Sequence, residues 1–256
     1  MGEKTGIQWT NRTWNPWRGC EKISPGCKNC YMFTEQKRYG NDPGVVVRTK
    51  TWGDPLKWQK EAASKGEKQM VFTCSWSDWF HEDADLWRPE AWAVVRSCPN
   101  LIFQILTKRP ERIHDHLPMD WRDGYPNVWL GVSVENRHHG LPRIDALRYE
   151  NARIRFLSIE PLLESLGPLD LTGIHWGIIG GESGPGARQC SLDWISNVAA
   201  HFENQNVPVF VKQLGSKPVE WNPTLGEYER YPIRDHKGGD IFEFPVSLQV
   251  RQFPKL

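Results

Sequence analysis

Short apolar runs alternate with helix-like segments along most of the chain. The runs that we expect to be strands are Ile7–Thr10, Met70–Ser75, Leu101–Thr107, Val128–Val134, Ile154–Ile159, Ile174–Ile179 and Val207–Val211. The segments that we expect to be helices are Tyr31–Tyr39, Leu56–Lys65, Arg88–Ser97, Pro110–His116, Leu141–Leu147 and Leu192–Asn204. Apolar runs separated by helices are typical of a parallel sheet with helices outside it. The pattern therefore predicts an α/β fold, a partial (β/α) TIM-like barrel with parallel strands.

The 256 residues suit one domain of this kind. We expect a cysteine-containing region over 1–40, β/α units over 41–214 and an irregular tail over 215–256. The tail is rich in Pro, Gly and charge and shows no clear periodicity. No internal repeat or low-complexity run points to a second core.

Polar residues follow the predicted strands at the point where each strand ends. They are Asp78, Lys108, Glu135, Asn136, Glu160, Glu182 and Lys212. Because the carboxyl ends of parallel strands share one rim, we expect these side chains to lie close together in a polar pocket.

Three cysteines lie in one stretch, Cys20, Cys27 and Cys30, with gaps of six and two residues. A C-x-x-C step points two thiolates at one metal or cluster. A helix that begins directly after Cys30 would favour thiolates through its N-terminal partial charge.

A structural zinc ion needs a fourth ligand, for which His81, Cys74 and Cys190 are the candidates. No second C-x-x-C or C-x-x-H completes such a set, which favours an iron–sulfur cluster with one open iron. A non-catalytic zinc or iron–sulfur module that recognises nucleic acid or a partner protein is the alternative.

The composition narrows the setting. The net charge of +1 gives no general case for affinity to nucleic acid or to a membrane surface. Residues 1–6 hold no apolar signal core, and no apolar run is long enough to cross a membrane, so we expect a cytoplasmic protein with reduced thiols. The 14 tryptophans favour core packing, and stacking on a planar base is the alternative.

The segment 180–188 is rich in glycine and follows a predicted strand. It is either a tight turn or a loop whose bare backbone lets a ligand approach, with Glu182 and Arg188 as polar anchors. Its spacing matches neither a P-loop nor a dinucleotide fingerprint. Lys108 and Arg109, at another strand end, either bind a phosphate or carboxylate or belong to a solvated loop.

Several motifs resemble a phage-associated three-cysteine-motif family of uncharacterised function. They are Trp14-Asn15-Pro16, Gly19-Cys20, Ser24-Pro25-Gly26-Cys27-Lys28-Asn29-Cys30-Tyr31, Leu106-Thr107-Lys108-Arg109-Pro110, Trp129-Leu130-Gly131-Val132-Ser133-Val134-Glu135-Asn136, Arg155-Phe156-Leu157-Ser158-Ile159-Glu160-Pro161-Leu162, Gly180-Gly181-Glu182-Ser183-Gly184-Pro185-Gly186-Ala187-Arg188, Val211-Lys212-Gln213 and Asp235-His236-Lys237-Gly238-Gly239. That family is similar to radical S-adenosylmethionine (SAM) enzymes, whose cysteine loop follows the first strand of a partial barrel. The first gap here is six residues, where the radical SAM loop has three.

The resemblance implies a [4Fe-4S] cluster on Cys20, Cys27 and Cys30, with SAM on the open iron. The enzyme would generate a 5′-deoxyadenosyl radical that modifies or repairs a substrate such as a nucleic-acid base or nucleotide. The residues that would bind the cofactor are Asp78, Ser133, Glu135, Glu160, Gly180, Gly181 and Glu182, and those that would bind the substrate are Lys108, Arg188 and Lys212. The resemblance also implies a dedicated partner protein encoded nearby.

Overall fold

The computed structural model describes residues 5–255, which form two compact units. The first contains residues 5–23, 30–132 and 145–155, and the second contains residues 24–29, 133–144 and 156–255. Each unit is described by itself. The middle of the cysteine stretch thus belongs to the second unit, whereas Cys20 and Cys30 belong to the first.

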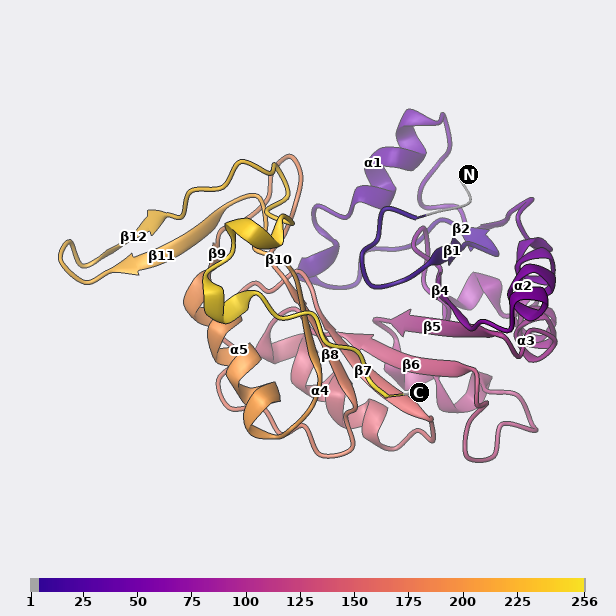
Figure 1. The fold of residues 1–256 in the computed structure, drawn as a ribbon. Coiled ribbons are helices and arrows are strands. Elements are labelled where there is room, and N and C mark those ends of the chain that lie inside the picture. The colour runs from indigo at the N-terminus through magenta and orange to yellow at the C-terminus, as the bar shows by residue number, and fades with distance from the viewer. Residues whose placement is uncertain (1–4, 256) are drawn as a thin grey trace. The chain divides into compact units, whose positions relative to one another are not determined.

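The first unit is a parallel β/α arrangement (Figure 1). Its strands are β1 (Arg12–Trp14), β2 (Trp17–Arg18), β3 (Val47–Arg48), β4 (Gln69–Thr73), β5 (Leu101–Thr107) and β6 (Val128–Ser133), which ends at the unit boundary. Its helices are α1 (Tyr31–Arg38), α2 (Asp54–Lys65) and α3 (Arg88–Arg96), with 3₁₀ turns η2 (Glu82–Ala84), η3 (Pro110–Arg112) and η4 (His114–His116). Strands β1, β4, β5 and β6 pair in that order and in parallel, while β2 and β3 form a short antiparallel pair.

Tryptophan rings fill much of the core of the first unit. Trp14, Trp17 and Trp79 are completely buried. The ring of Trp79 lies 5.8 Å from that of Trp14, 5.2 Å from that of Trp17 and 5.0 Å from that of Trp92. Edge-on and tilted ring contacts of this kind add to the apolar area that each ring buries. For these four tryptophans the predicted packing role is confirmed.

The second unit combines parallel strands with a small antiparallel sheet. Its elements are η1 (Pro25–Cys27), α4 (Arg137–Arg148), β7 (Ile154–Ile159), β8 (Trp176–Gly180), β9 (Cys190–Ser191), α5 (Leu192–Asn204), β10 (Val209–Gln213), β11 (Pro218–Asn222), β12 (Glu227–Arg230), η5 (Ile241–Glu243) and η6 (Val246–Leu248), of which α4 and β7 cross a unit boundary. Strand β8 pairs in parallel with β7 and β10, and β11 pairs with β9 and β12. Helix α5 packs on β8 and β10, where Gly177 is needed because a Cβ atom there would lie 2.3 Å from the ring of Phe202.

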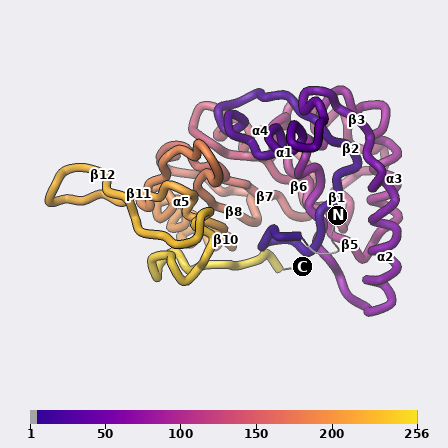
Figure 2. Tube along the Cα trace, turned by 90° about the horizontal axis from the view of Figure 1, so that it is seen from above, coloured from indigo at the N-terminus to yellow at the C-terminus, as the bar shows by residue number. Residues whose placement is uncertain are grey.

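The strand order β1-β4-β5-β6-β7-β8-β10 confirms the predicted fold class, an α/β fold with the parallel strands of a partial TIM-like barrel. Figure 2 follows the same chain from above. Most predicted strands and helices are present within a few residues of their expected ends, and β5, β7 and α5 have the expected ends.

Three predictions about elements were wrong. The first strand is β1 at Arg12–Trp14, whereas residues 7–10 form a turn. The expected helix at 110–116 is two 3₁₀ turns, because the His-Asp-His run at 114–116 consists of weak helix formers. The tail, expected to be irregular, contains the β11–β12 hairpin.

No helix in the described part of the chain is long and apolar enough to span a bilayer. The expectation of no signal core concerns residues 1–6, of which 1–4 lie outside the described residues. The single domain and the cytoplasmic setting stay predictions.

Candidate metal centre

The backbone of Cys20 is fixed in the first unit by its neighbour Gly19. Gly19 has φ +97°, and a Cβ atom there would lie 2.2 Å from the carbonyl oxygen of Val45, so both conformation and space require glycine. The amide of Gly19 donates to the carbonyl of Trp76, and the amide of Cys20 donates to that of Pro43. The cysteine is therefore held by segments that follow α1 and β4.

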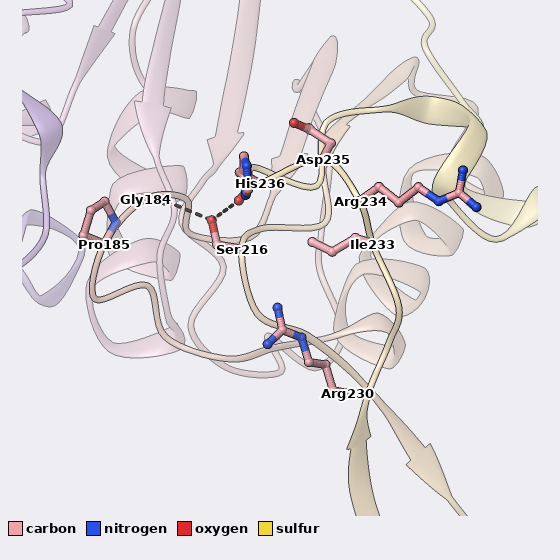
Figure 3. A pocket seen from close by; sticks show the side chains of 8 residues that line it. All are labelled: Gly184, Pro185, Ser216, Arg230, Ile233, Arg234, Asp235 and His236. Carbon is pink, nitrogen blue, oxygen red and sulfur yellow. Dashed lines mark hydrogen bonds between the residues drawn. The ribbon is translucent and has the colours of Figure 1, made fainter.

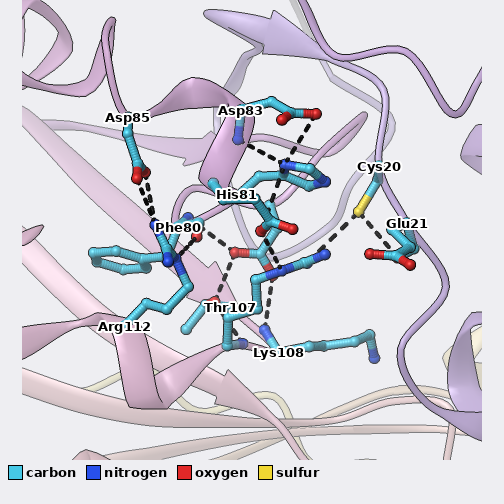
Figure 4. Close-up of polar contacts among 12 residues, drawn as sticks. Cys20, Glu21, Phe80, His81, Asp83, Asp85, Thr107, Lys108 and Arg112 are labelled. Atoms are coloured by element: carbon cyan, nitrogen blue, oxygen red, sulfur yellow. Dashed lines mark hydrogen bonds and ion pairs between the residues drawn. The ribbon is translucent and has the colours of Figure 1, made fainter.

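A buried guanidinium lies against the sulfur of Cys20 (Figure 4). The Nη1 of Arg109 donates to Cys20 Sγ at 3.9 Å, and the arginine is only 4% exposed. Burial alone would lower the pKa of Arg109, but Asp78 and Cys20 outweigh it and the pKa is raised. A permanently charged donor next to this sulfur stabilises the thiolate over the thiol.

Asp78 holds this arginine in place. Its Oδ2 lies 3.6 Å from Arg109 Nη1 and also accepts from the amide of Lys108 at 2.8 Å. Its Oδ1 accepts from the hydroxyl of Thr107 and from the amide of Phe80. The carboxylate thus joins the end of β5 to the segment after β4, and its contacts are those of an anchor for Arg109. Binding of SAM by Asp78 stays a prediction.

Two further side chains border Arg109. Glu82 lies 3.5 Å from Arg109 Nε, and its pKa is lowered, first by its own backbone amide and then by His81 and Arg109, against the opposing effect of burial. His81 is almost fully buried, and burial, followed by Arg109, lowers its pKa. Within residues 5–255, His81 Nε2 and Arg109 Nη2 are buried nitrogens without a hydrogen-bond partner. Unfilled donor capacity beside a cysteine suits an additional anionic acceptor there.

Cys30 is the N-cap residue of α1 in the same unit. The first amides of a helix and its dipole give this position a partial positive charge. A cysteine at such a position is favoured as a thiolate. The hydroxyl of Tyr31, the first residue of the helix, donates to the carbonyl of Ser75 and so fixes the helix start beside the end of β4.

In the second unit, Glu135 holds the middle of the cysteine stretch. Its side chain is completely buried after β6. One oxygen accepts from the hydroxyl of Ser24 at 2.7 Å and the other from the amide of Gly26 at 2.6 Å. Arg143 of α4 lies 3.3 Å from the same carboxylate and balances its charge. Glu135 therefore fixes the turn η1 that presents Cys27.

Gly26 cannot be replaced without moving this carboxylate. A Cβ atom at Gly26 would lie 2.3 Å from the carboxyl carbon of Glu135. The Pro25-Gly26 step is thus a close approach of backbone to a buried anion. Cys27 itself is buried, and its sulfur lies 3.5 Å from the hydroxyl of Ser24.

The glycine-rich segment makes a second contact with the cysteine stretch inside the second unit. Glu182, directly after β8, takes a two-pronged ion pair from Arg188 at 2.9 and 2.6 Å. Asn29 donates to Glu182 and to the carbonyl of Gly186, and Arg188 donates to the carbonyl of Pro25. Burial would raise the pKa of Glu182, but its bonds to Arg188 and Asn29 lower it. The segment 180–188 is therefore a clamp on residues 25–29.

The remaining predicted site residues lie close to strand ends of the second unit. Lys212 pairs with Glu160 at 2.5 Å across β10 and the end of β7. Ser133 is buried, and its carbonyl accepts from Arg143. Gly181 lets the carbonyl of Leu214 approach, since a Cβ atom would lie 2.2 Å from it. Gly180 lies near Gln213 and Glu160 in the same way. Their roles in binding a cofactor or a substrate stay predictions.

The other cysteines have the properties of core residues. Burial raises the pKa of the Cys98 thiol to about 11 and that of Cys190 to about 12, and Cys74 is shifted upward by burial and by Asp78. Among the described residues, which include all the cysteines, none forms a disulfide. Their burial and these upward shifts match the core-packing role expected for isolated cysteines.

Across residues 5–255, no group of three or more His, Cys, Asp or Glu side chains is gathered to hold a metal ion. The donor chemistry around individual cysteines nevertheless fits bound anionic sulfur. A buried cation lies at Cys20, a helix N-terminus at Cys30 and a hydroxyl at Cys27. Residues 20, 27 and 30 thus fit the thiolate ligands expected from the sequence in their chemistry.

Sequence reasoning missed three residues that hold the stretch. Arg109 was considered together with Lys108 as a possible anion site, and its contact with Cys20 was not expected. Arg143 carried no signal, because only its contact with Glu135 gives it a role, and the role of Asn29 comes from its contact with Glu182. A signal for Asn29 was available in its place inside the C-x-x-C step.

The chain is an α/β protein with parallel strands. Residues that directly follow these strands bond to the cysteine stretch, which is the candidate thiolate site. The fold of the chain is similar to that of a solved spore photoproduct lyase mutant in which serine replaces a cysteine, with a TM-score of 0.52 and 13% sequence identity. The match covers 97% of this chain and 75% of that one, and at this identity the likeness concerns the fold.

The chain belongs to the family described as "Protein of unknown function (DUF5131)", which matches residues 4–240. This confirms the predicted resemblance to an uncharacterised family, whereas the phage association stays a prediction. Comparison with curated proteins gave no match.

Proposed function

We propose that this chain is an iron–sulfur enzyme of the radical SAM type. The observation that carries the proposal is the anchoring of its cysteine stretch by residues at strand ends. Glu135 and Glu182 hold residues 24–29 in the second unit, and Arg109 lies at Cys20 in the first. Ligand-binding loops of parallel β/α proteins lie at the carboxyl ends of their strands.

The fold comparison supports the same class. Spore photoproduct lyase is a radical SAM enzyme, and its chain is similar in fold over nearly the whole of this one. The low identity limits that support to the scaffold. The cysteines and their surroundings carry the remainder of the argument.

The residues that would hold a [4Fe-4S] cluster are Cys20, Cys27 and Cys30. When bound together with SAM, the cluster supplies the electron that cleaves SAM to a 5′-deoxyadenosyl radical. Arg109 donates to the sulfur of Cys20 and brings a positive charge to a centre that would carry negative charge. Glu135 and Arg188 fix the backbone on either side of Cys27.

The substrate class that we propose is a nucleic-acid base or nucleotide, modified or repaired at a carbon from which hydrogen is removed. A dedicated partner protein is part of the same proposal.

The test is anaerobic purification followed by measurement of iron, sulfide and visible absorbance. We expect a brown protein that releases 5′-deoxyadenosine when SAM and dithionite are added. Cys27→Ser should lose the cluster, and Cys98→Ala, which changes a core cysteine outside the stretch, should keep its iron.

A colourless protein that carries zinc would contradict the proposal. A brown protein that never cleaves SAM would reduce it to an iron–sulfur role without radical chemistry. Full cluster content in Cys27→Ser would show that the ligands are assigned wrongly.

A further inference from the structure

A pocket is lined in part by the glycine-rich segment, through Gly184 and Pro185. It has a volume of about 340 Å³ and is formed entirely within the second unit (Figure 3). Its lining residues are Gly184, Pro185, Ser216, Arg230, Ile233, Arg234, Asp235 and His236. The segment 180–188 therefore contributes both to the pocket and to the clamp on residues 25–29.

Two arginines and a histidine give this pocket its chemistry. The side chains of Arg230, Arg234 and His236 form no ion pair or hydrogen bond among the described residues. The nearby acids are occupied by backbone amides instead. Glu243 accepts from the amides of residues 234 and 235, and Asp235 accepts from the amide of Gly239. The guanidinium groups are thus available to an anion from outside.

The hairpin β11–β12 extends the same surface with aromatic rings. Its register pairs Trp221 with Tyr228 and Val219 with Arg230. Because residues alternate between faces, these four side chains share one face of the hairpin. The two aromatic rings lie 5.2 Å apart and are about half exposed, at 47% and 48%. The hairpin projects away from β8 and β10 in Figures 1 and 2.

The opposite face of the hairpin is acidic. Glu220 is paired with Glu229, and Asn222 with Glu227, so the carboxylates lie together on that side. An anionic partner would be repelled from this face and attracted to the aromatic face, which continues to Arg230. The two faces of the hairpin therefore differ. One carries the exposed aromatic rings and Arg230, and the other carries the carboxylates.

We propose that this surface binds single-stranded nucleic acid. Phosphates would contact Arg230, Arg234 and His236, and bases would stack on Trp221 and Tyr228. The proposal rests on the proposed function in one respect, since the bound strand would be the substrate or would carry it. Exposed aromatic rings beside unpaired arginines are the combination that single strands require, because every base has a stacking face and every linkage a charge.

The experiment measures fluorescence anisotropy of labelled oligothymidylate and oligouridylate strands of about twelve nucleotides, within the span that stacking surfaces cover. Binding is followed from about 50 to about 200 mM salt, where phosphate contacts weaken steeply. We expect both strands to bind more tightly than a duplex of equal length, because the bases of a duplex are not free to stack. The DNA and RNA arms show which strand is preferred.

Two double variants separate the parts of the surface. Trp221→Ala with Tyr228→Ala should raise the dissociation constant by at least about thirtyfold, which is about fivefold or more for each of two stacked bases, and leave the salt slope unchanged. Arg230→Ala with Arg234→Ala should weaken binding and reduce the slope of the salt plot by about 1.4, or about 0.7 for each phosphate contact. The matched control is Arg96→Ala with Arg148→Ala, which removes the same charge from arginines paired with Asp120 and Asp145. Circular dichroism checks that all variants are folded.

Wild-type affinity in both double variants would overturn the proposal, as would equal affinity for the duplex. Displacement of the strand by an equally long polyglutamate would show a general anion site and would overturn it as well. Failure of this proposal can be distinguished from failure of the proposed function. Strand binding without SAM cleavage would contradict the radical chemistry alone. SAM cleavage without strand binding would contradict only the binding role of this surface.

Discussion

The beginning and the middle of the cysteine stretch are held in different ways. In the first unit a cation lies at the sulfur of Cys20, and Arg109 in turn is held by Asp78. In the second unit two carboxylates, Glu135 and Glu182, hold the backbone and side chains of residues 24–29. The first arrangement acts on the electrostatics of a sulfur, and the second acts on the position of a loop.

This difference predicts different consequences of mutation. Loss of a carboxylate in the second unit should release the loop and with it Cys27. Loss of the cation in the first unit should leave the loop in place and change the properties of whatever Cys20 binds. The mutations below test the two arrangements in order of expected effect on stability.

Glu135→Ala should have the largest effect. It removes a buried carboxylate, leaves Arg143 without its ionic partner and frees Ser24 and Gly26. We expect the free energy of unfolding to fall by about 3–5 kcal/mol and the iron content to drop. Chemical unfolding and iron analysis measure both. The control is Glu164→Gln, an exposed acceptor for the amide of Arg137, and equal losses in the two variants would contradict the role of Glu135.

Arg109→Gln should cost about 2–3 kcal/mol, because Asp78 loses a charged neighbour but keeps its other donors. In the loaded protein, loss of the cation disfavours the more negative reduced cluster. The midpoint potential should therefore fall by on the order of 50 mV, close to a tenfold change for one electron.

A redox titration followed by electron paramagnetic resonance measures this shift. Lys108→Gln is the control, since it removes an adjacent positive charge and keeps the amide that bonds to Asp78. An unchanged potential in Arg109→Gln, or the same shift in the control, would show that Arg109 has a structural role alone.

Arg188→Lys should have a smaller effect of about 1–2 kcal/mol, because lysine cannot supply the two-pronged pair with Glu182 and the bond to Pro25 together. Hydrogen exchange of residues 24–29 should become faster. Arg148→Lys at a surface pair with Asp145 is the control, for which little change is expected. An unchanged exchange rate in Arg188→Lys would show that Arg188 does not hold residues 24–29 in place.

The smallest effect is a dependence of stability on pH. The pKa of Glu182 is lowered from its ordinary value of 4.5, so the carboxylate contributes stability above that value and loses it as pH falls through the folded-state pKa. The difference in unfolding free energy between wild type and Glu182→Gln should be constant near neutral pH and shrink below 4.5. A difference that persists unchanged in acid would mean that the charge of Glu182 is not what stabilises the clamp.

The sequence predicted the parts of the fold whose signal is local. Strands β5 and β7 are apolar runs bounded by polar residues, and α5 has an apolar stripe with Ser191 as its N-cap. Strand β1 was misplaced because three residues give too short a pattern to distinguish from the turn before it. The β11–β12 hairpin was missed because β12 is exposed throughout and lacks alternation of apolar and polar residues.

The sequence indicated which residue types lie at the strand ends, but it did not indicate which residues they contact. The strand-end acids were expected from the topology. Their partners are distant in the sequence, because Gly26 lies 109 positions from Glu135 and Asn29 lies 153 positions from Glu182. Arg109 meets Cys20 across 89 positions. No local pattern encodes such contacts, so the hold of these two carboxylates on the cysteine stretch was not predicted. Their binding of a cofactor stays a prediction.

The clamp on residues 25–29 also determines when this segment can fold during synthesis. Its partners at Glu182 and Arg188 leave the ribosome more than 150 residues after Asn29. Until then this clamp is absent, and Glu135 alone is available to hold the turn that carries Cys27. Residues 25–29 therefore reach their fully clamped position only after the glycine-rich segment has emerged.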